Sequence, residues 1–307
     1  MANVATTISN TPEKINIKDL IVAQQPLAAL CTYKTGGNAD FLASPTNLEQ
    51  MKALLAFSRQ NQLPITILGG GSNVLISDEG VPGLVILTHK LCSYHVRGTL
   101  FCAQSGLSLE TAINASIENS LSGLETLGGL PGTIGGAVWG NASTHGLQLS
   151  QLIEWVDYLT PDGEIARIHR DDDRFAYKRS PFMGTRNIIY EVALRLIPNK
   201  NTSEARLHKE QSRKERMDSG QFDHPSAGCV FKNPRGKPAG MLIDEAGMKG
   251  LTVGGASISS LHGNFIINTD GTATSKDILK LAELARKAVS DRFGIKLERE
   301  IVLIGRW

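Results

Sequence analysis

The residues with the clearest chemical meaning are three consecutive glycines followed by a serine and an asparagine, Gly69 to Asn73. Apolar residues flank this group at 65–68 and 74–76, which is typical of two short buried strands joined by a loop. Glycine lacks a Cβ, so the backbone N–H groups of such a loop can approach a ligand closely. Together with the Ser72 hydroxyl and the Asn73 amide, consecutive N–H donors favour an anion such as pyrophosphate. Taken alone, the group is also compatible with an ordinary tight loop between strands.

Two further glycine-rich segments strengthen the case for a ligand. The stretch 128–146 holds seven glycines among large apolar side chains, a mixture that flexible linkers lack, so we expect something flat or extended to lie against this backbone. The segment 32–38 adds a close glycine pair, Gly36 and Gly37. The chain contains neither a Gly-x-Gly-x-x-Gly fingerprint nor a Gly-x-x-x-x-Gly-Lys-Ser/Thr loop, which argues against the two commonest nucleotide-binding folds.

Composition excludes several classes of function. The 307 residues carry a formal net charge of +2, which gives no basic footprint for nucleic acid. The one basic cluster, 206–216, is typical of a solvated helix face formed by Lys209, Glu210, Arg213, Lys214 and Glu215. No apolar run is long enough to span a membrane, and residues 1–16 lack the features of a secretory signal. We therefore expect a cytoplasmic protein that needs no membrane, nucleic acid or protein partner.

The cysteines and histidines carry no metal-binding pattern. The four cysteines, at 31, 92, 102 and 229, show no Cys-x-x-Cys spacing, and the seven histidines are dispersed. In a reducing compartment we expect free thiols, with Cys31, Cys92 and Cys102 packing as small hydrophobic residues. The sequence therefore predicts no metal centre.

The elements that must position these segments follow from hydrophobic periodicity. Amphipathic patterns predict helices over 47–60, 108–119 and 275–293, the last with a Thr274-x-x-Asp277 capping box and Gly294 as its stop. Short apolar runs predict strands near 84–87, 94–103, 155–160, 164–169, 188–196 and 264–268, with a hairpin turn at 161–163. This alternation indicates an α+β fold, divided into an N-terminal segment with a first lobe (1–90), a second lobe (91–200) and a C-terminal domain (201–307).

In their order and spacing, the glycine segments resemble those of the UDP-N-acetylenolpyruvoylglucosamine reductases, the MurB family of bacterial cell-wall synthesis. The resemblance runs from about Thr32 to Gly305 and is far more specific than any single glycine loop. Its later motifs are Tyr177–Phe182, Pro225–Pro234, Ala239–Gly250, His262–Asn268 and Leu297–Gly305.

The resemblance implies a two-lobed FAD-binding domain of the vanillyl-alcohol-oxidase type and a smaller C-terminal α+β substrate-binding domain. The length is similar to that of the shorter family type, which lacks a tyrosine loop over the substrate. It also implies noncovalent FAD, NADPH as reductant, and a nucleotide-sugar substrate, UDP-N-acetylglucosamine enolpyruvate. The positions that match cofactor-binding motifs are Thr35, Gly36, Gly69, Gly70, Gly71, Ser72, Asn73, Gly132, Thr133, Ile134, Gly135, Gly136, Ala137, Asn141, Ala142 and Gly146.

The chemistry implied by the family is hydride transfer from FAD N5 to C3 of an enolpyruvyl ether, followed by protonation at C2. In the family, an Arg after the Tyr of the Tyr-Arg-x-Ser-x-Phe motif stabilises the developing charge. Here Lys178 stands at that position and Arg179 follows it. Lysine keeps the charge but loses the planar guanidinium fork. If the segment is a strand, its side chains alternate between faces, which favours Lys178, but Arg179 stays an alternative.

The second departure lies in the Gly-Ser-x-Phe-Lys-Asn-Pro motif, where Cys229 replaces the proton-donating Ser. A thiol is more acidic than a hydroxyl and can serve the same role, which would also make the enzyme sensitive to thiol reagents. The family glutamate matches Glu300, although Glu298 would share its face on a strand. By the same resemblance, Tyr177, Lys232 and Asn233 are expected to bind substrate.

Two other functions stay open on the residues alone. A flavin oxidase or dehydrogenase of the same fold would pass electrons to oxygen, but it leaves the match at 225–234 unexplained. A non-catalytic flavin or nucleotide-sugar binder would explain the departures at Lys178 and Cys229. Both alternatives predict binding of FAD without turnover of the enolpyruvyl substrate.

Overall fold

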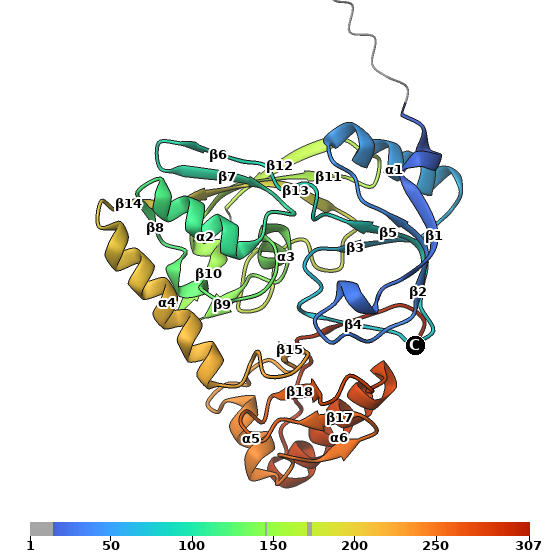
Figure 1. The fold of residues 1–307 in the computed structure, drawn as a ribbon, viewed down its shortest axis with the longest axis vertical. Helices are drawn as coiled ribbons and strands as arrows, with labels where there is room; N and C mark the ends of the chain where they lie inside the picture. Colours follow the sequence, from blue (N-terminus) through green and yellow to red (C-terminus); the bar gives the residue numbers. More distant parts are fainter. Residues whose placement is uncertain (1–14, 145, 171–173) are drawn as a thin grey trace, which may run out of the picture.

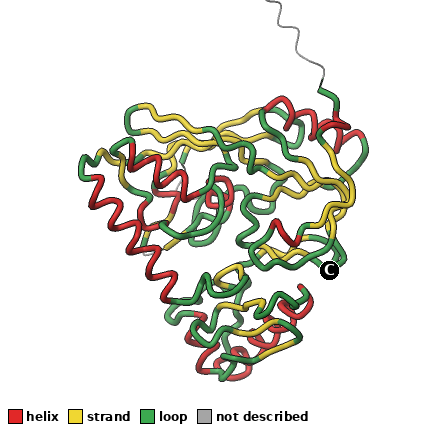
Figure 2. The backbone as a smooth tube through the Cα atoms, viewed as in Figure 1, coloured by secondary structure: helices red, strands yellow, loops and turns green. Residues whose placement is uncertain are grey.

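The computed structural model describes residues 15–144, 146–170 and 174–307 (Figure 1). The polar segment 1–16, for which we expect no secretory signal, lies almost entirely outside these ranges. Three larger β-sheets of four, five and four strands, each with at least one α-helix, form three parts of the molecule, and the loops between them gather in the middle (Figure 2). In the described part of the chain, no helix combines the length and the apolar character needed to cross a membrane.

The first part is a four-stranded sheet with one helix. Its strands are, in spatial order, β1 (Ile21–Pro26), β2 (Asn38–Ala43), β5 (Val81–Leu87) and β3 (Ile65–Leu68). β1 is antiparallel to β2, whereas β2, β5 and β3 are parallel. Helix α1 (Leu48–Gln60) begins at Asn47, whose side chain accepts a hydrogen bond from the Gln50 N–H, and the predicted helix is confirmed.

The second part is a five-stranded antiparallel sheet. Its strands are, in spatial order, β12 (Ile165–His169), β11 (Ile153–Leu159), β13 (Ile188–Arg195), β7 (Leu100–Gln104) and β6 (Tyr94–Arg97). The predicted strands are confirmed. The predicted hairpin turn is confirmed too, because β11 and β12 pair antiparallel and Gly163 between them has a φ of 86°. Its remaining elements are α2 (Leu109–Glu118), α3 (Ile134–Trp139), η3 (Glu125–Leu127), η4 (Leu149–Gln151) and the two-residue strands β8 (Leu121–Ser122), β14 (Ile197–Pro198), β9 (Ser143–Thr144) and β10 (Leu147–Gln148).

Helix α4 (Thr202–Asp218) leads from the second part to the third (Figure 1). The expected solvated face is confirmed at Glu210, Arg213, Lys214 and Glu215, which are exposed, but the expectation is wrong for Lys209, because α4 packs against α2 and η3. Lys209 is only 7% exposed, and its ammonium lies 2.6 Å from the Glu110 carboxylate and 2.9 Å from the Asn114 oxygen on α2. Burial by a neighbouring helix cannot be read from the pattern of charges within α4 alone.

The third part is an antiparallel sheet with two helices. Its strands are, in spatial order, β15 (Ser226–Cys229), β18 (Phe265–Asn268), β17 (Ala256–Ile258) and β16 (Thr252–Val253). Helix α5 (Ala239–Glu245) is short, and α6 (Ser275–Phe293) has the predicted bounds, the Thr274–Asp277 capping box and Gly294 in a left-handed conformation. The predicted helix 275–293 is therefore confirmed at both ends.

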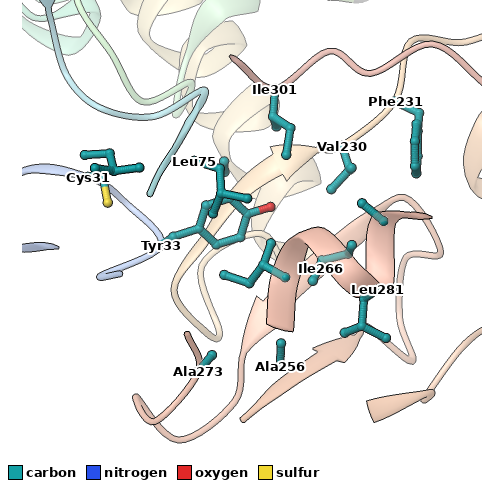
Figure 3. Close-up of a cluster of buried hydrophobic side chains, with 14 of the residues drawn as sticks. Cys31, Tyr33, Leu75, Val230, Phe231, Ala256, Ile266, Ala273, Leu281 and Ile301 are labelled. Atoms are coloured by element: carbon teal, nitrogen blue, oxygen red, sulfur yellow. The ribbon is translucent and has the colours of Figure 1, made fainter. Parts of the chain in front are cut away.

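The first and third parts share one hydrophobic core (Figure 3). Leu75 of β4 (Val74–Ile76), Val230 and Leu281 of α6 belong to this core, and Tyr33 is completely buried in it. The last strand, β19 (Val302–Ile304), runs parallel to β4 and joins the chain end to the first part. The second part has a separate core, built on its own sheet and helices. The third part is thus fixed to the first by apolar packing.

Candidate active site

The glycine loop after β3 leaves its backbone donors free. None of the N–H groups of residues 69–73 finds a hydrogen-bond acceptor among the described residues. Buried or half-buried N–H groups without an acceptor are rare, so a run of such donors indicates a place for a bound anion. The side chains bond to backbone carbonyls of other segments instead. Ser72 Oγ donates to the Pro131 carbonyl at 2.9 Å, and Asn73 Nδ2 donates to the backbone carbonyl of Glu300 at 3.2 Å.

Several glycines of this site are required by contacts within the protein. A Cβ on Gly70 would lie 2.8 Å from Gly132 Cα, and a Cβ on Gly69 would lie 2.7 Å from Thr133 Oγ1. The two glycine-rich segments therefore pack directly against each other, backbone to backbone. Gly70 and Gly136 remain exposed. Glycine thus serves both to bring the two loops together and to leave their outer surface bare.

The other residues expected at the cofactor divide into two groups. Thr35 is 4% exposed and its hydroxyl lies 2.7 Å from that of Ser275, while a Cβ on Gly36 would lie 2.7 Å from Ile76 Cβ. Ile134 and Ala137 are buried in the core of the second part, and Gly135 packs on Ser105. The more open positions are Gly69, Gly70, Ser72, Asn73, Gly132, Gly136, Ala142 and Gly146. The assignment of all these residues to FAD stays a prediction.

The segment that carries Lys178 is a tight turn, so the condition under which side chains would alternate between two faces of a strand is not met. The Ala176 N–H donates to the Arg179 oxygen at 3.2 Å, and the Arg179 N–H donates to the Ala176 oxygen at 3.0 Å. Tyr177 and Lys178 form the corner, with Lys178 at a φ of 53°. The Lys178 ammonium lies 2.5 Å from the Glu300 carboxylate, whereas Arg179 is exposed. The structure therefore places Lys178, rather than Arg179, inside the site.

Cys229 is the last residue of β15, and Glu300 lies in the irregular segment that precedes β19. The Glu300 N–H donates to the Val230 oxygen at 2.8 Å, and the Val302 N–H donates to the Asn73 oxygen at 3.0 Å. The C-terminal segment thus runs between the strand that carries Cys229 and the glycine loop. Lys178 from the second part pairs with Glu300 from the chain end, the charges of both act on the Cys229 thiol of the third part, and Asn73 bonds to the Glu300 backbone.

The electrostatics of this group keep the thiol protonated. Burial, followed by the negative charge of Glu300, raises the pKa of Cys229 to about 11, although the Lys178 ammonium and the Asn264 side chain act in the opposite direction. The Lys178 and Glu300 side chains are 18% and 15% exposed. A half-buried acid, a cation and a carboxylate are therefore held together in a site that admits little water.

Glu298 and Glu300 do not share a face, because the segment before β19 is not a regular strand. The Glu298 side chain is 73% exposed and lies 2.5 Å from the Lys232 ammonium. Asn233 Oδ1 accepts a hydrogen bond from the Ala239 N–H at the start of α5, and Tyr177 is 45% exposed. The roles of Tyr177, Lys232 and Asn233 in substrate binding stay predictions.

Asn264 is a residue of the site that the sequence analysis did not single out. It is 2% exposed, its Oδ1 accepts from the Phe231 N–H at 2.9 Å and its Nδ2 donates to the Phe231 oxygen at 2.8 Å. These bonds fix the chain just after Cys229. No local signal in the sequence could have indicated this role, because its partner Phe231 lies 33 residues away.

The remaining cysteines differ from one another. Cys31 and Cys102 are buried as expected, but Cys92 is exposed, so its expected packing is wrong. Among the described residues, no group of three or more His, Cys, Asp or Glu side chains is placed to hold a metal ion. A pocket of about 320 Å³ opens beside the glycine loops, lined by Thr32, Lys34, Pro131 and residues 221–226.

Comparison with known proteins extends over nearly the whole chain. Residues 39–169 match the family described as "FAD binding domain", and residues 220–304 match "UDP-N-acetylenolpyruvoylglucosamine reductase, C-terminal domain". A UDP-N-acetylenolpyruvoylglucosamine reductase of Synechococcus is 37% identical over 98% of this chain and 96% of its own length. One of Lactiplantibacillus plantarum is 35% identical over 93% of this chain and 94% of its own length. The crystal structure of the Thermus caldophilus reductase has a TM-score of 0.77 and 34% identity, covering 92% of this chain and 98% of its own.

Proposed function

The chain belongs to the UDP-N-acetylenolpyruvoylglucosamine reductase family, and we propose that it reduces UDP-N-acetylglucosamine enolpyruvate to UDP-N-acetylmuramate with FAD and NADPH. The observation that carries the proposal is the meeting of Lys178, Cys229 and Glu300 beside the glycine loop, although two of the three depart from the family pattern. The reaction belongs to peptidoglycan precursor synthesis. We place it in the cytoplasm, with the nucleotide sugar as the substrate.

The glycine loops suit the cofactor. The free N–H groups of 69–73 would hold the pyrophosphate of FAD, because a run of such donors binds an anion without a basic side chain. A Cβ at Gly69, Gly70 or Gly132 would not fit between the two loops. When bound, FAD supplies the hydride that adds to C3 of the enolpyruvyl group. The fit of this chain to the cofactor therefore rests on backbone rather than on side chains.

Lys178 would bind the substrate carboxylate. An ammonium has three N–H donors, and among the described residues only Glu300 accepts from that of Lys178, so two donors remain for the carboxylate. As C3 receives the hydride, negative charge develops on the carboxylate-conjugated carbon, and a fixed cation there lowers the barrier. Glu300 holds the ammonium in place for this purpose. A lysine can thus replace an arginine here because the site itself supplies the orientation.

Cys229 would donate the proton to C2. With a pKa of about 11, the thiol is protonated at neutral pH and can act as an acid. The proton moves from Sγ to C2, which balances the hydride added at C3, and the thiolate that remains regains a proton from water. The neighbouring Lys178 ammonium stabilises the thiolate during this interval. The replacement of serine by cysteine is therefore compatible with catalysis.

Anaerobic NADPH consumption by the FAD-loaded protein tests the proposal. With catalytic amounts of enzyme, we expect many turnovers in the presence of UDP-N-acetylglucosamine enolpyruvate and no sustained consumption without it. A single stoichiometric reduction of the flavin, with substrate bound but unchanged, would overturn the proposal in favour of a binding protein. Rapid reoxidation by oxygen without turnover of the substrate would instead indicate an oxidase.

A further inference from the structure

Asn141 is completely buried just after α3, at the end of the second glycine-rich segment. Its backbone has a φ of 42°, a left-handed conformation that Asn and Asp tolerate better than other side chains. The residue was expected to bind the cofactor. Its surroundings point to a different task for the side chain.

The amide side chain of Asn141 is fully engaged with the protein. Nδ2 donates to the Ala176 oxygen at 2.8 Å and to Gln148 Oε1 at 3.2 Å, so neither N–H is free for a ligand. Oδ1 accepts from the Ser150 N–H at 3.0 Å. The Ala176 carbonyl can only accept and the Ser150 N–H can only donate, so the orientation of the Asn141 amide is determined.

The carbonyl that Asn141 holds belongs to the turn that carries Lys178. Ala176 is the first residue of that turn, and it forms both backbone hydrogen bonds with Arg179. A second attachment lies on the other side, where Ser180 Oγ donates to the Trp139 oxygen at 2.6 Å. The turn is therefore attached at one end to the last residue of α3 and at the other to Asn141, two residues further along.

Lys178 needs such support. Its φ of 53° is unfavourable for a residue with a Cβ, and such conformations persist only where the surroundings fix them. The ammonium must nevertheless reach Glu300 at 2.5 Å across the boundary between two parts of the molecule. A small shift of the turn would move the ammonium away from Glu300 and from the substrate.

We propose that Asn141 is a positioning residue, which holds the turn 176–179 through the Ala176 carbonyl so that Lys178 meets Glu300 and the substrate carboxylate. The inference rests on the proposed function of Lys178. By this inference, the Asn141 side chain positions the Lys178 ammonium and does not bind the flavin.

Asn141→Asp is the sharpest variant. Aspartate keeps the size, the tolerance for a left-handed backbone and the acceptor for Ser150, but it loses both donors and sets a carboxylate against the Ala176 oxygen. We expect substrate-dependent reoxidation of the flavin to slow by about 10- to 100-fold, because small misplacements of a catalytic group have effects of this size. FAD affinity and flavin reduction by NADPH should stay unchanged. Loss of FAD binding would overturn the inference.

Asn119→Asp is the matched control. Asn119 Nδ2 donates to the Ala115 oxygen at 2.8 Å at the end of α2, so the variant removes an equivalent amide-to-carbonyl bond at another place. We expect it to lower thermal stability without slowing reoxidation. If Asn141→Asp does not fold, Ser180→Ala removes the other attachment of the turn, and the same slowing is expected. A Ser180→Ala protein with the parent rate would then contradict the inference.

The chemical reactivity of Lys178 in the protein without cofactor reports directly whether its ammonium is still paired with Glu300. The rate of lysine acetylation is followed by mass spectrometry. In the parent, Lys178 should react slowly, because its side chain is 18% exposed and paired with Glu300. In Asn141→Asp it should react roughly several-fold faster, because the pair with Glu300 is lost. Lys232, which pairs with the exposed Glu298, should react equally in both. Equal protection of Lys178 in both proteins would overturn the inference.

A double-variant cycle separates the inference from the proposed function. If Asn141 acts through Lys178, Asn141→Asp should cause no further slowing in a Lys178→Ala background. Equal additional slowing in that background would contradict the positioning role. If Lys178→Ala alone leaves reoxidation unchanged, the proposed function of Lys178 fails. If Lys178→Ala is slow and Asn141→Asp matches the parent, only the positioning role fails.

Discussion

Two lysine–glutamate pairs use carboxylates from the same short C-terminal segment, Glu298 and Glu300, and differ in almost everything except the distance between their charged groups. Lys178–Glu300 and Lys232–Glu298 both have an N–O separation of 2.5 Å. The side chains of the first pair are 18% and 15% exposed, whereas those of the second are 24% and 73% exposed. Only the first pair faces Cys229. The difference shows that burial and neighbours, rather than pairing itself, make such a pair useful for chemistry.

The physical reason lies in solvent screening. An exposed ion pair contributes about 0–1 kcal/mol, because water screens both charges and the side chains lose entropy. In a fully buried pair, removal of one partner leaves an uncompensated charge and costs about 3–5 kcal/mol, and the half-buried Lys178–Glu300 pair lies between these two cases. The two carboxylates of the C-terminal segment thus form one half-buried pair beside Cys229 and one exposed pair at the surface.

The largest effect is expected from removal of the acid beside the buried pair. Cys229→Ala should slow substrate-dependent reoxidation of the flavin by about 10²- to 10⁴-fold, the usual contribution of a general acid. Reduction by NADPH should be unaffected, because the thiol takes no part in it. Stopped-flow measurement of the two half-reactions checks this. If the reoxidation rates of variant and parent are the same, Cys229 has no part in the mechanism.

The next effect breaks the buried pair itself. Lys178→Ala should slow reoxidation by about 10²- to 10³-fold through loss of charge stabilisation at the substrate. Arg179→Ala, one residue further along the turn, should be close to silent because Arg179 is exposed. Steady-state and stopped-flow rates for both variants decide the matter. A silent Lys178→Ala with a slow Arg179→Ala would mean that the turn presents the other cation during catalysis.

The pH dependence of flavin reoxidation tests the effect of burial on the pKa of Cys229. The pKa of Cys229 is raised to about 11, so the thiol stays protonated, and reoxidation should be flat through neutral pH and fall only as the pH approaches that value. Glu300→Gln removes a charge that raises this pKa, so the fall should begin at lower pH. Cys229→Ser should abolish it, since a hydroxyl does not titrate there. An unchanged profile in Cys229→Ser would assign the fall to another group.

The elements of the fold could be predicted because their signals are local. Helix α6 follows from Thr274, Asp277 and Gly294, which mark its two ends within the sequence itself. Loops between strands followed from glycine and proline in the same way. Lys209 shows the limit, because its burial depends on α2, which lies far away in the sequence.

The site could be predicted in composition but not in geometry. The segment around Lys178, for which the sequence left the choice between Lys178 and Arg179 open, is a turn whose Ala176 carbonyl accepts a hydrogen bond from Asn141, 35 residues away. Glu298 and Glu300 point in different directions because backbone bonds to Lys232 and Val230 twist the segment that carries them. Such long-range bonds leave no periodic trace in the sequence.

The smallest effect is expected at the exposed pair. Glu298→Gln and Lys232→Ala should each lower the free energy of unfolding by less than about 1 kcal/mol, as is usual for an exposed ion pair, and urea denaturation measures this. The two variants nevertheless separate packing from recognition. If Lys232 binds the nucleotide sugar, Lys232→Ala should raise KM for the substrate with little change in kcat, because it removes binding made equally in the ground and transition states.

Glu298→Gln serves as the control for that experiment, since it breaks the same pair and keeps the lysine. We expect its KM to equal that of the parent or to fall slightly, because the Lys232 ammonium is then free for the substrate. Equal KM values in both variants would leave Lys232 as a surface residue. A fall in kcat in either variant would mean that the exposed pair, like the buried one, acts on the reacting group, and the contrast between the two pairs would fail.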